Sequence, residues 1–321
     1  MSFLRSVAGI ILVAKPLTSI GTAQTQRNIK RWVAPTLREL RHRAKKQGPQ
    51  KPESRSGYVE WNYRSELFAF GKRLQESFQL PVLQAAFTQP SYVHQERERQ
   101  RKLGIEEVDL QATDNTELAA KGAHIAKAYV EAYLQHSLPK MPSAGQQAIA
   151  AYLLSDNTLA YVALHLGTKE LIFSAEYPPT TETLAQTLQA VIGALSDSSG
   201  VERAFIFVRD FVCTQLNQKD LLDLWKPSEP IKLLTEVCQQ RNLGDVEPRL
   251  LGDCGKNTVL AAYHVGIYAN RQLLGKGFGE DVNTATETAA LDALQTLFDM
   301  HDNRQPFNFQ LQVEPKNVRL A

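Results

Sequence analysis

Residues 183–194, TLAQTLQAVIGA, belong to the part of the sequence that decides the fold. They lie in an expected helix, 183–195, within a region that is built from helical segments throughout. The clearest of these is 63–78, whose apolar residues recur at steps of three and four, the period of an amphipathic helix. No strand-like alternation accompanies them, so the sequence predicts an all-α domain over 61–226. The remaining helices are expected at 80–87, 113–134, 146–166 and 201–216.

Local signals mark the ends of three of these helices. The stretch TQPSY at 88–92 interrupts the chain after the second helix. Asp114 or Asn115 is expected to cap the N-terminus of the alanine-rich helix 113–134. Gly167 follows the helix 146–166 and is expected to end it.

Residues 228–301 have a different pattern. A helix is expected over 230–241, followed by extended segments in which residues 263–267 alternate with period two. Residues 269–271 read as a hairpin turn, and the Gly-x-Gly-x-Gly run from Gly275 ends the strands. A final helix is expected over 283–298, with alanines on its packing side. The order α-β-β-β-α makes the whole chain α+β.

The length and composition suit two globular domains. The chain has 321 residues, of which 43% are hydrophobic and 22% charged. Its longest apolar run, residues 7–14, is about half of the roughly 18 residues that a membrane-spanning helix needs. The three cysteines include no Cys-x-x-Cys pair. This excludes a disulfide scaffold and a cysteine-built zinc site, and it fits a reducing compartment.

Positive charge is concentrated at the N-terminus. Residues 1–56 contain 12 Lys and Arg against two acids, whereas residues 57–321 contain 24 basic and 32 acidic residues. Residues 1–38 have no acid and are rich in Ser and Thr, which is typical of a mitochondrial presequence. We therefore expect a presequence over 1–30, with a disordered tail and a secretory signal as alternatives.

A basic extension is expected over 31–60. Its cations include Arg41, Arg43, Lys45 and Lys46, with interspersed Pro and Gly, and it is not expected to fold alone. One interpretation is a solvated linker. The other is an extended arm whose cations neutralise phosphates of a folded RNA.

Short motifs in both domains carry a family resemblance. Residues 86–92 (AFTQPSY), 153–160 (LLSDNTLA) and 183–194 resemble three segments of the ribonuclease III endonuclease domain, in the same order. The pattern that opens at Pro230, the glycine run from Gly275 and the alanines at 289–293 resemble a double-stranded-RNA-binding domain. The resemblance covers about three-quarters of the chain and implies the fold of both domains.

The departures from the ribonuclease III pattern affect its metal site. The family signature N-E-R-L-E-F-L-G-D corresponds here to NTELAAKGA at 115–123. The resemblance implies magnesium-binding carboxylates at four positions, which this chain fills with Ala119, Ala123, Gln186 and Gln189. Magnesium needs anionic oxygen ligands, so we expect no metal or other cofactor, no catalytic residue and no hydrolysis.

Two nearby acids do not replace the lost ligands. Glu117 lies about 200° around the helix from position 119, and Glu182 lies roughly 6 Å along the axis from position 186. The family homodimerises partly through apolar residues of the signature helix, where this chain has Ala120 and Lys121. A homodimer is therefore not expected, although the same face could meet a different partner.

The RNA-binding module also departs from its family. The lysine pair that grips phosphates at the start of the last helix corresponds here to residues 281–284, Asp-Val-Asn-Thr. Tight, independent binding to duplex RNA is therefore not expected. The residues that the resemblance leaves as candidate RNA contacts are Glu236, Lys256, Asn257, Asn283 and Thr284.

The combination of presequence, degenerate nuclease domain and reduced RNA-binding module resembles mitochondrial large-subunit ribosomal proteins that couple these two domains. It implies a structural component of the mitochondrial ribosome in the matrix, in contact with large-subunit rRNA and neighbouring ribosomal proteins. The alternatives are a mitochondrial RNA-processing endoribonuclease, an assembly factor of the ribonuclease III family and a free regulatory RNA-binding protein. A segment over 302–321 is expected to form a C-terminal tail.

Overall fold

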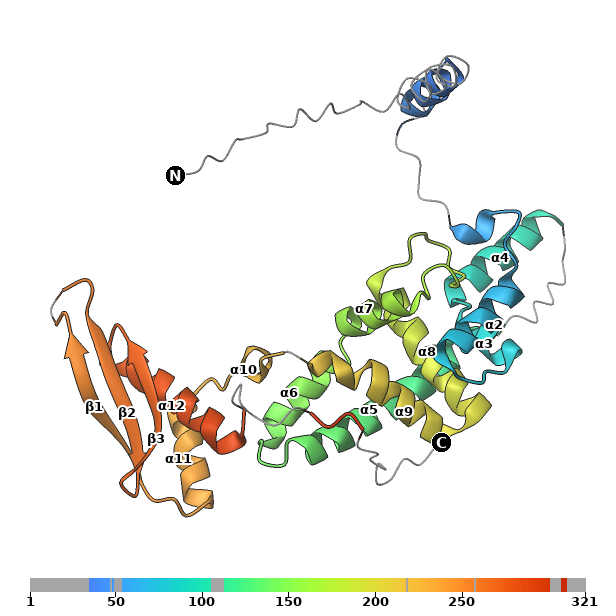
Figure 1. Ribbon diagram of the computed structural model, residues 1–321. Helices are drawn as coiled ribbons and strands as arrows, with labels where there is room; N and C mark the ends of the chain where they lie inside the picture. Colours follow the sequence, from blue (N-terminus) through green and yellow to red (C-terminus); the bar gives the residue numbers. More distant parts are fainter. Residues whose placement is uncertain are drawn as a thin grey trace, which may run out of the picture. The chain divides into compact units, whose positions relative to one another are not determined.

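A computed structural model describes most of the chain after the N-terminal segment (Figure 1). It divides the chain into two compact units, Met1–Glu53 and Ser54–Ala321. The expected presequence lies outside the described residues, and so does most of the expected tail. None of the described helices is both long enough and apolar enough to cross a membrane. The described residues are 35–46, 48, 54–104, 113–217, 219–256, 258–300 and 307–310.

The described part of the first unit consists of a helix over residues 35–46 and residue 48. Every residue of this helix is exposed. Arg43 Nε lies 3.3 Å from Glu39 Oε1, the i,i+4 spacing at which opposite charges support a helix. The expectation of an extended arm was therefore wrong for this segment, which places its cations on a helix.

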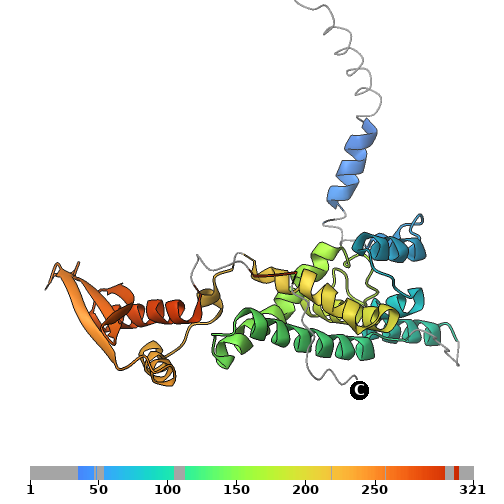
Figure 2. The same ribbon diagram turned by 60° about the horizontal axis from the view of Figure 1, so that its bottom comes forward.

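The second unit begins with a helical domain (Figure 1). The long helix α5 packs against α6, α8 and α9, and Figure 2 shows α5 alongside the yellow helices. Its core includes Phe70, Phe87, Tyr129 and Tyr133, all buried. The helices are α2 (Tyr63–Leu74), α3 (Leu80–Ala86), α4 (Pro90–Lys102), α5 (Thr116–Ser137), α6 (Ser143–Leu153), α7 (Asp156–Leu166), α8 (Thr181–Ser199), α9 (Val201–Phe211) and α10 (Leu221–Leu224), with short 3₁₀ turns η1 (Arg55–Gly57) and η2 (Cys213–Leu216).

Three expected helices are shorter than the periodicity indicates. The helix expected over 201–216 ends at Phe211, and a separate 3₁₀ turn covers Cys213–Leu216. The helix expected over 63–78 ends at Leu74, because Gln75 has the left-handed conformation, with φ 56°. The segment expected as one helix over 146–166 is two helices, α6 and α7. Ser155 separates them, because its hydroxyl accepts a hydrogen bond from the Thr158 amide and so starts a new helix.

The expected break at 88–92 is the start of another helix. Pro90 is the first residue of α4, a position where its missing N–H leaves no hydrogen bond unmade. Just before it, Thr88 forms an isolated parallel bridge with Phe173. The Phe173 amide donates to the Phe87 carbonyl at 2.9 Å, so one extended contact joins segments that are far apart in the sequence.

Asn115 occupies the N-cap position of α5, but its side chain does not cap the helix. Asn115 is fully buried, and its side-chain Nδ2 donates to the Ala86 carbonyl at 3.3 Å. The expected capping bond is therefore replaced by a bond that ties α5 to the end of α3.

The second domain has the predicted order α-β-β-β-α. It consists of α11 (Pro230–Gln240), β1 (Val246–Cys254), β2 (Ala262–Ala269), β3 (Gln272–Gly279) and α12 (Val282–Phe298). The strands form an antiparallel sheet in the order β1-β2-β3. Asn270 and Arg271 form the β2–β3 turn, and both have positive φ, as a tight hairpin turn requires. The α+β fold is thus confirmed.

The glycine run on β3 allows one helix to approach the sheet closely. A Cβ atom on Gly275 would lie 2.4 Å from the Ala293 amide nitrogen, and one on Gly277 would lie 2.2 Å from the Ala289 amide nitrogen. The alanine side of α12 therefore rests directly on the backbone of β3, and α11 packs against α12 (Figure 1).

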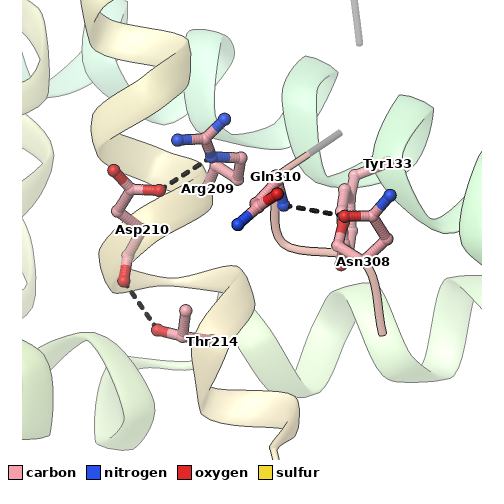
Figure 3. A network of polar contacts seen from close by, with 6 residues as sticks. All are labelled: Tyr133, Arg209, Asp210, Thr214, Asn308 and Gln310. Atoms are coloured by element: carbon pink, nitrogen blue, oxygen red, sulfur yellow. Dashed lines mark hydrogen bonds and ion pairs between the residues drawn. The ribbon is translucent and has the colours of Figure 1, made fainter. Parts of the chain in front are cut away.

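After this domain, residues 307–310 contact the helical domain. The Phe309 ring stacks on Tyr133, with ring centres 6.3 Å apart and planes at 12°. The Tyr133 hydroxyl donates to the Asn308 carbonyl at 3.5 Å. The Gln310 amide donates to Asn308 Oδ1 at 3.0 Å, beside Tyr133 (Figure 3). The chain thus leaves the helical domain, builds the second domain and then returns to α5.

Candidate functional site

The four positions expected to have lost metal ligands lie on α5 and α8, at the closest approach of these helices. A Cβ atom on Gly122 would lie 1.8 Å from the Gln189 carbonyl oxygen. A Cβ atom on Gly193 would lie 2.2 Å from the Leu118 carbonyl oxygen. The two backbones are therefore in direct contact, which brings the segment containing Ala119 and Ala123 against the segment containing Gln186 and Gln189.

The side chains at these positions carry no charge. Ala119 is buried, and Ala123, Gln186 and Gln189 are half-buried. Glu117 and Glu182, the nearby acids, are both exposed. Lys121 forms an ion pair with Asp197 across the same pair of helices, so the charged group that α5 turns toward α8 is a cation.

A neutral hydrogen-bond network lies beside this crossing. Gln89, at the start of α4, donates to the Thr187 hydroxyl at 3.0 Å and to the Thr183 carbonyl at 3.4 Å. Thr187 in turn donates to the Thr183 carbonyl at 2.7 Å. Gln89 and Thr187 are both buried. This network joins α4 to α8 with amide and hydroxyl groups alone.

The candidate RNA contacts of the second domain are divided among three places. Glu236 is exposed on α11, and Lys256 is exposed in the β1–β2 loop, where its ammonium lies 3.8 Å from Asp253 Oδ2. Asn283 is exposed in the first turn of α12. Asn257 lies outside the described residues.

Thr284 has a structural role at the start of α12. Its hydroxyl oxygen accepts from the Asp281 amide at 3.1 Å, and the Asp281 side chain accepts from the backbone of the third helical residue. This reciprocal pair is a capping box. The Thr284 hydroxyl also donates to the Asp281 carbonyl at 2.8 Å. Residue 284 therefore stabilises the start of α12.

Comparison with known families places both domains in one protein type. A family model described as "Large ribosomal subunit protein mL44, endonuclease domain" matches residues 62–195. A second, described as "MRPL44 dsRNA-binding domain", matches residues 225–320. The large ribosomal subunit protein mL44 of Caenorhabditis elegans is 30% identical over 300 residues, which are 92% of this chain and 75% of that protein. The chain belongs to the mL44 family.

More distant similarity extends to nucleases. Ribonuclease 3 of Carboxydothermus hydrogenoformans is 24% identical over 241 residues, which are 73% of this chain and 97% of the enzyme. The solved nuclease domain of ribonuclease III from Campylobacter jejuni matches 47% of this chain and 96% of its own, with 20% identity and a TM-score of 0.39. The mL44 assignment depends on the family models and the C. elegans relative.

The α5–α8 site of this mL44 family member does not fit the magnesium of ribonuclease III. A hard divalent cation needs several oxygen ligands, with carboxylates among them. Two methyl groups and two neutral amides provide no negative charge that could hold a cation. Among the described residues, no group of three or more His, Cys, Asp or Glu side chains could hold a metal ion. The site therefore lacks the ligands for a metal-dependent reaction step.

Proposed function

We propose that this chain is a structural component of the mitochondrial large ribosomal subunit and that it performs no RNA cleavage. Membership of the mL44 family supports the first part. The second part is supported by one observation: the four positions where the resemblance implies carboxylates hold Ala119, Ala123, Gln186 and Gln189, brought together where α5 and α8 are in contact. Two methyl groups and two neutral amides supply neither the charge nor the ligands for metal-assisted phosphodiester hydrolysis.

The proposal includes a domain arrangement. Residues 1–30 would be a presequence, 31–60 a basic extension and 302–321 a tail. The degenerate nuclease domain would span 61–226 and the RNA-binding module 228–301. N-terminal sequencing of the protein from purified mitochondria tests the first boundary. A mature protein that still begins at Met1 would contradict the presequence.

The exposed helix at 35–46 supplies the cations proposed to contact rRNA. Arg41, Arg43, Lys45 and Lys46 are all exposed on it. Arg43 shares its charge with Glu39, and no ion pair within the described residues involves the other three. Cations without a protein partner are available to displace counterions from RNA phosphates. The RNA-binding module would add contacts from Glu236, Lys256, Asn257 and Asn283, while a homodimer is not part of the proposal.

Sedimentation of a mitochondrial extract tests the ribosomal assignment. We expect the protein to migrate with mature large subunits in stoichiometric amount at both moderate and high salt. Migration with precursor particles alone would indicate an assembly factor instead. In parallel, the purified chain is incubated with duplex RNA and Mg²⁺, and we expect no cleavage. Magnesium-dependent products would overturn the non-enzymatic part of the proposal.

A charge-removal variant tests the role of the basic helix. Changing Arg41, Arg43, Lys45 and Lys46 to Ala should reduce the magnitude of the slope of log K against log salt for rRNA binding by about 2.8 to 3.6, since each of four phosphate contacts contributes roughly 0.7–0.9. The matched control changes Arg97, Arg99, Arg101 and Lys102 on α4, another exposed set of four cations. Equal losses in the two variants would show that the N-terminal helix has no special role.

A further inference from the structure

The sheet of the second domain carries an exposed aromatic stack. Phe278 of β3 is 66% exposed and lies opposite His264 of β2 in the strand register. The two rings are stacked, with centres 4.2 Å apart and planes at 11°. His264 occupies one side of the Phe278 ring, and β3 lies at the edge of the three-stranded sheet. The Phe278 ring is therefore held in place by its neighbour and still presents a free surface for further stacking.

This stack lies on the face of the sheet that the helices do not cover. A Cβ atom on Gly277 or Gly279 of β3 would collide with the backbone of α12. Because side chains alternate along a strand, Lys276 and Phe278 point to the opposite face. The candidate RNA contacts of α11 and α12 lie on the helical side of the domain, since these two helices pack together. The aromatic stack is therefore separate from them.

An unpaired cation stands beside the aromatic stack. Lys276 is exposed and lies two residues from Phe278 on the same face of β3, a separation of about 7 Å along the strand. No ion pair within the described residues involves its ammonium, and Glu280 lies beyond the end of β3. The Lys276 ammonium is therefore available to an anion from outside the chain.

The rest of this face combines rings, apolar side chains and charge. The Arg249 guanidinium of β1 lies 5.2 Å from the centre of the Tyr268 ring on β2 and 2.6 Å from Glu247 Oε2. Leu251 and Leu273 are exposed, by 42% and 40%. The strand residues on this face thus supply two cations against one acid, so the face has an excess of positive charge.

These features fit an unpaired nucleotide better than a protein surface. Burying an ammonium without a partner is costly, and lysine is depleted at the centres of protein–protein interfaces. A phosphate group neutralises such an ammonium, and the bases of a single strand stack on exposed aromatic rings whatever their sequence. Bases inside a duplex are stacked on one another, so a protein ring reaches a base only where the RNA is unpaired.

We propose that the aromatic sheet face, the surface formed by Phe278, His264 and Lys276, binds an unpaired nucleotide of RNA. The base would stack on Phe278, and a neighbouring phosphate would meet the Lys276 ammonium. The inference rests on the proposed function for the source of this RNA, which would be large-subunit rRNA. The module would then contact RNA from two sides, with an unpaired nucleotide on its sheet.

Fluorescence anisotropy of the purified full chain with a labelled oligouridine of about eight nucleotides tests this inference. Phe278→Leu keeps an apolar side chain but removes the ring, and it should weaken binding about 5- to 150-fold, the range for the loss of one base stack. Phe278→Tyr keeps the ring and should bind like the wild type. Lys276→Gln should reduce the magnitude of the slope of log K against log salt by about 0.7, the contribution of one phosphate contact on a single strand.

Phe68→Leu on α2 is the matched control. Phe68 is 57% exposed, and the Lys72 ammonium lies 5.4 Å from the centre of its ring, so this variant tests whether any exposed ring near a cation is enough. We expect Phe68→Leu to bind like the wild type. All the substituted side chains are exposed, so thermal unfolding should be unchanged in each variant. Equal losses at positions 68 and 278, unchanged affinity in Phe278→Leu, or no binding by the wild type would overturn the inference.

Photocrosslinking in assembled large subunits identifies what covers this face. The full chain carries benzoylphenylalanine in place of Phe278, and we expect a crosslink to rRNA at an unpaired nucleotide, mapped by reverse transcription. Crosslinks only to another ribosomal protein or to a second copy of this chain, or no crosslink at all, would contradict the inference. Failure of the wild-type chain to migrate with large subunits would refute the proposed function, whereas the oligouridine measurement would still decide the inference.

Discussion

A single methyl group at Gly122 should disrupt the packing of the helical domain. In Gly122→Ala, the new Cβ would lie 1.8 Å from the Gln189 carbonyl oxygen and 2.8 Å from the Gly193 amide nitrogen. An ordinary contact is at least 3.4 Å, so α5 and α8 would have to separate by about 1.6 Å. Both neighbours are backbone atoms, which cannot rotate away as a side chain can.

Two opposing effects determine the size of the change. Alanine in place of glycine within a helix is worth about 1 kcal/mol in favour of the variant. Overpacking costs typically 1–3 kcal/mol, and a displacement of this size belongs at or above the upper end. We therefore expect a net loss of at least about 2 kcal/mol in the free energy of unfolding. For a domain of this size, the loss lowers Tm by at least about 4 °C.

Thermal and urea denaturation of the purified chain measure this effect. The matched control is Gly57→Ala, because a Cβ atom there would have no neighbour within 4 Å, and we expect it to leave the unfolding free energy almost unchanged. A Gly122→Ala protein that is more stable than the wild type would mean that the higher helix propensity of alanine is the only effect of the substitution. That result would refute the backbone contact between α5 and α8.

Three further predictions concern thiols, phenols and the C-terminal contact. Burial raises the pKa of the Cys213 thiol to about 12, and Cys238 is also buried, whereas Cys254 is exposed. A thiol reagent at pH 8 should therefore modify Cys254 alone in the native protein and all three cysteines after denaturation. Early modification of Cys213 would contradict its burial. Burial likewise raises the pKa of Tyr129 to about 12, above its value of about 10 in the unfolded chain. The stability that this pKa difference provides is complete below pH 10 and is lost as the pH rises toward 12. The Tyr129→Phe variant should therefore show a smaller fall in Tm at alkaline pH than the wild type. An identical fall in both proteins would contradict the raised pKa of Tyr129. Phe309→Ala removes a ring stack and should destabilise the helical domain by about 1 kcal/mol in urea unfolding, whereas no change would show that the stack contributes nothing.

The sequence predicted the elements better than their ends. Periodicity identified most of the helices, because their buried residues recur at the helical spacing. It missed the start of α4, since Pro90 favours a turn and the first position of a helix equally. It also joined α6 to α7, although Ser155 has the side chain of an N-cap residue. In both cases the local sequence allows either a turn or a helix start, and the packing of the helices decides between them.

The candidate site was likewise predicted only in part. The roles of Ala119 and Gln186 follow from motifs, and Gly122 and Gly193 lie in the same motifs. The motifs do not show that these two glycines meet, because that contact is made only when α5 packs against α8. The aromatic sheet face was not predicted either. The period-two pattern of β3 shows that Phe278 and Lys276 lie on the same face of the sheet. It cannot show that α12 covers the opposite face.

The contact between Phe309 and Tyr133 affects the order in which the molecule can be completed. A chain made from its N-terminus presents α5 early, but the aromatic ring that stacks on Tyr133 emerges only after the whole second domain. Until then, this part of the α5 surface lacks its native cover. A chain that stops before residue 309 therefore lacks the ring stack and the Asn308 hydrogen bond on Tyr133, so the helical domain gains its full set of contacts only after synthesis has passed the second domain.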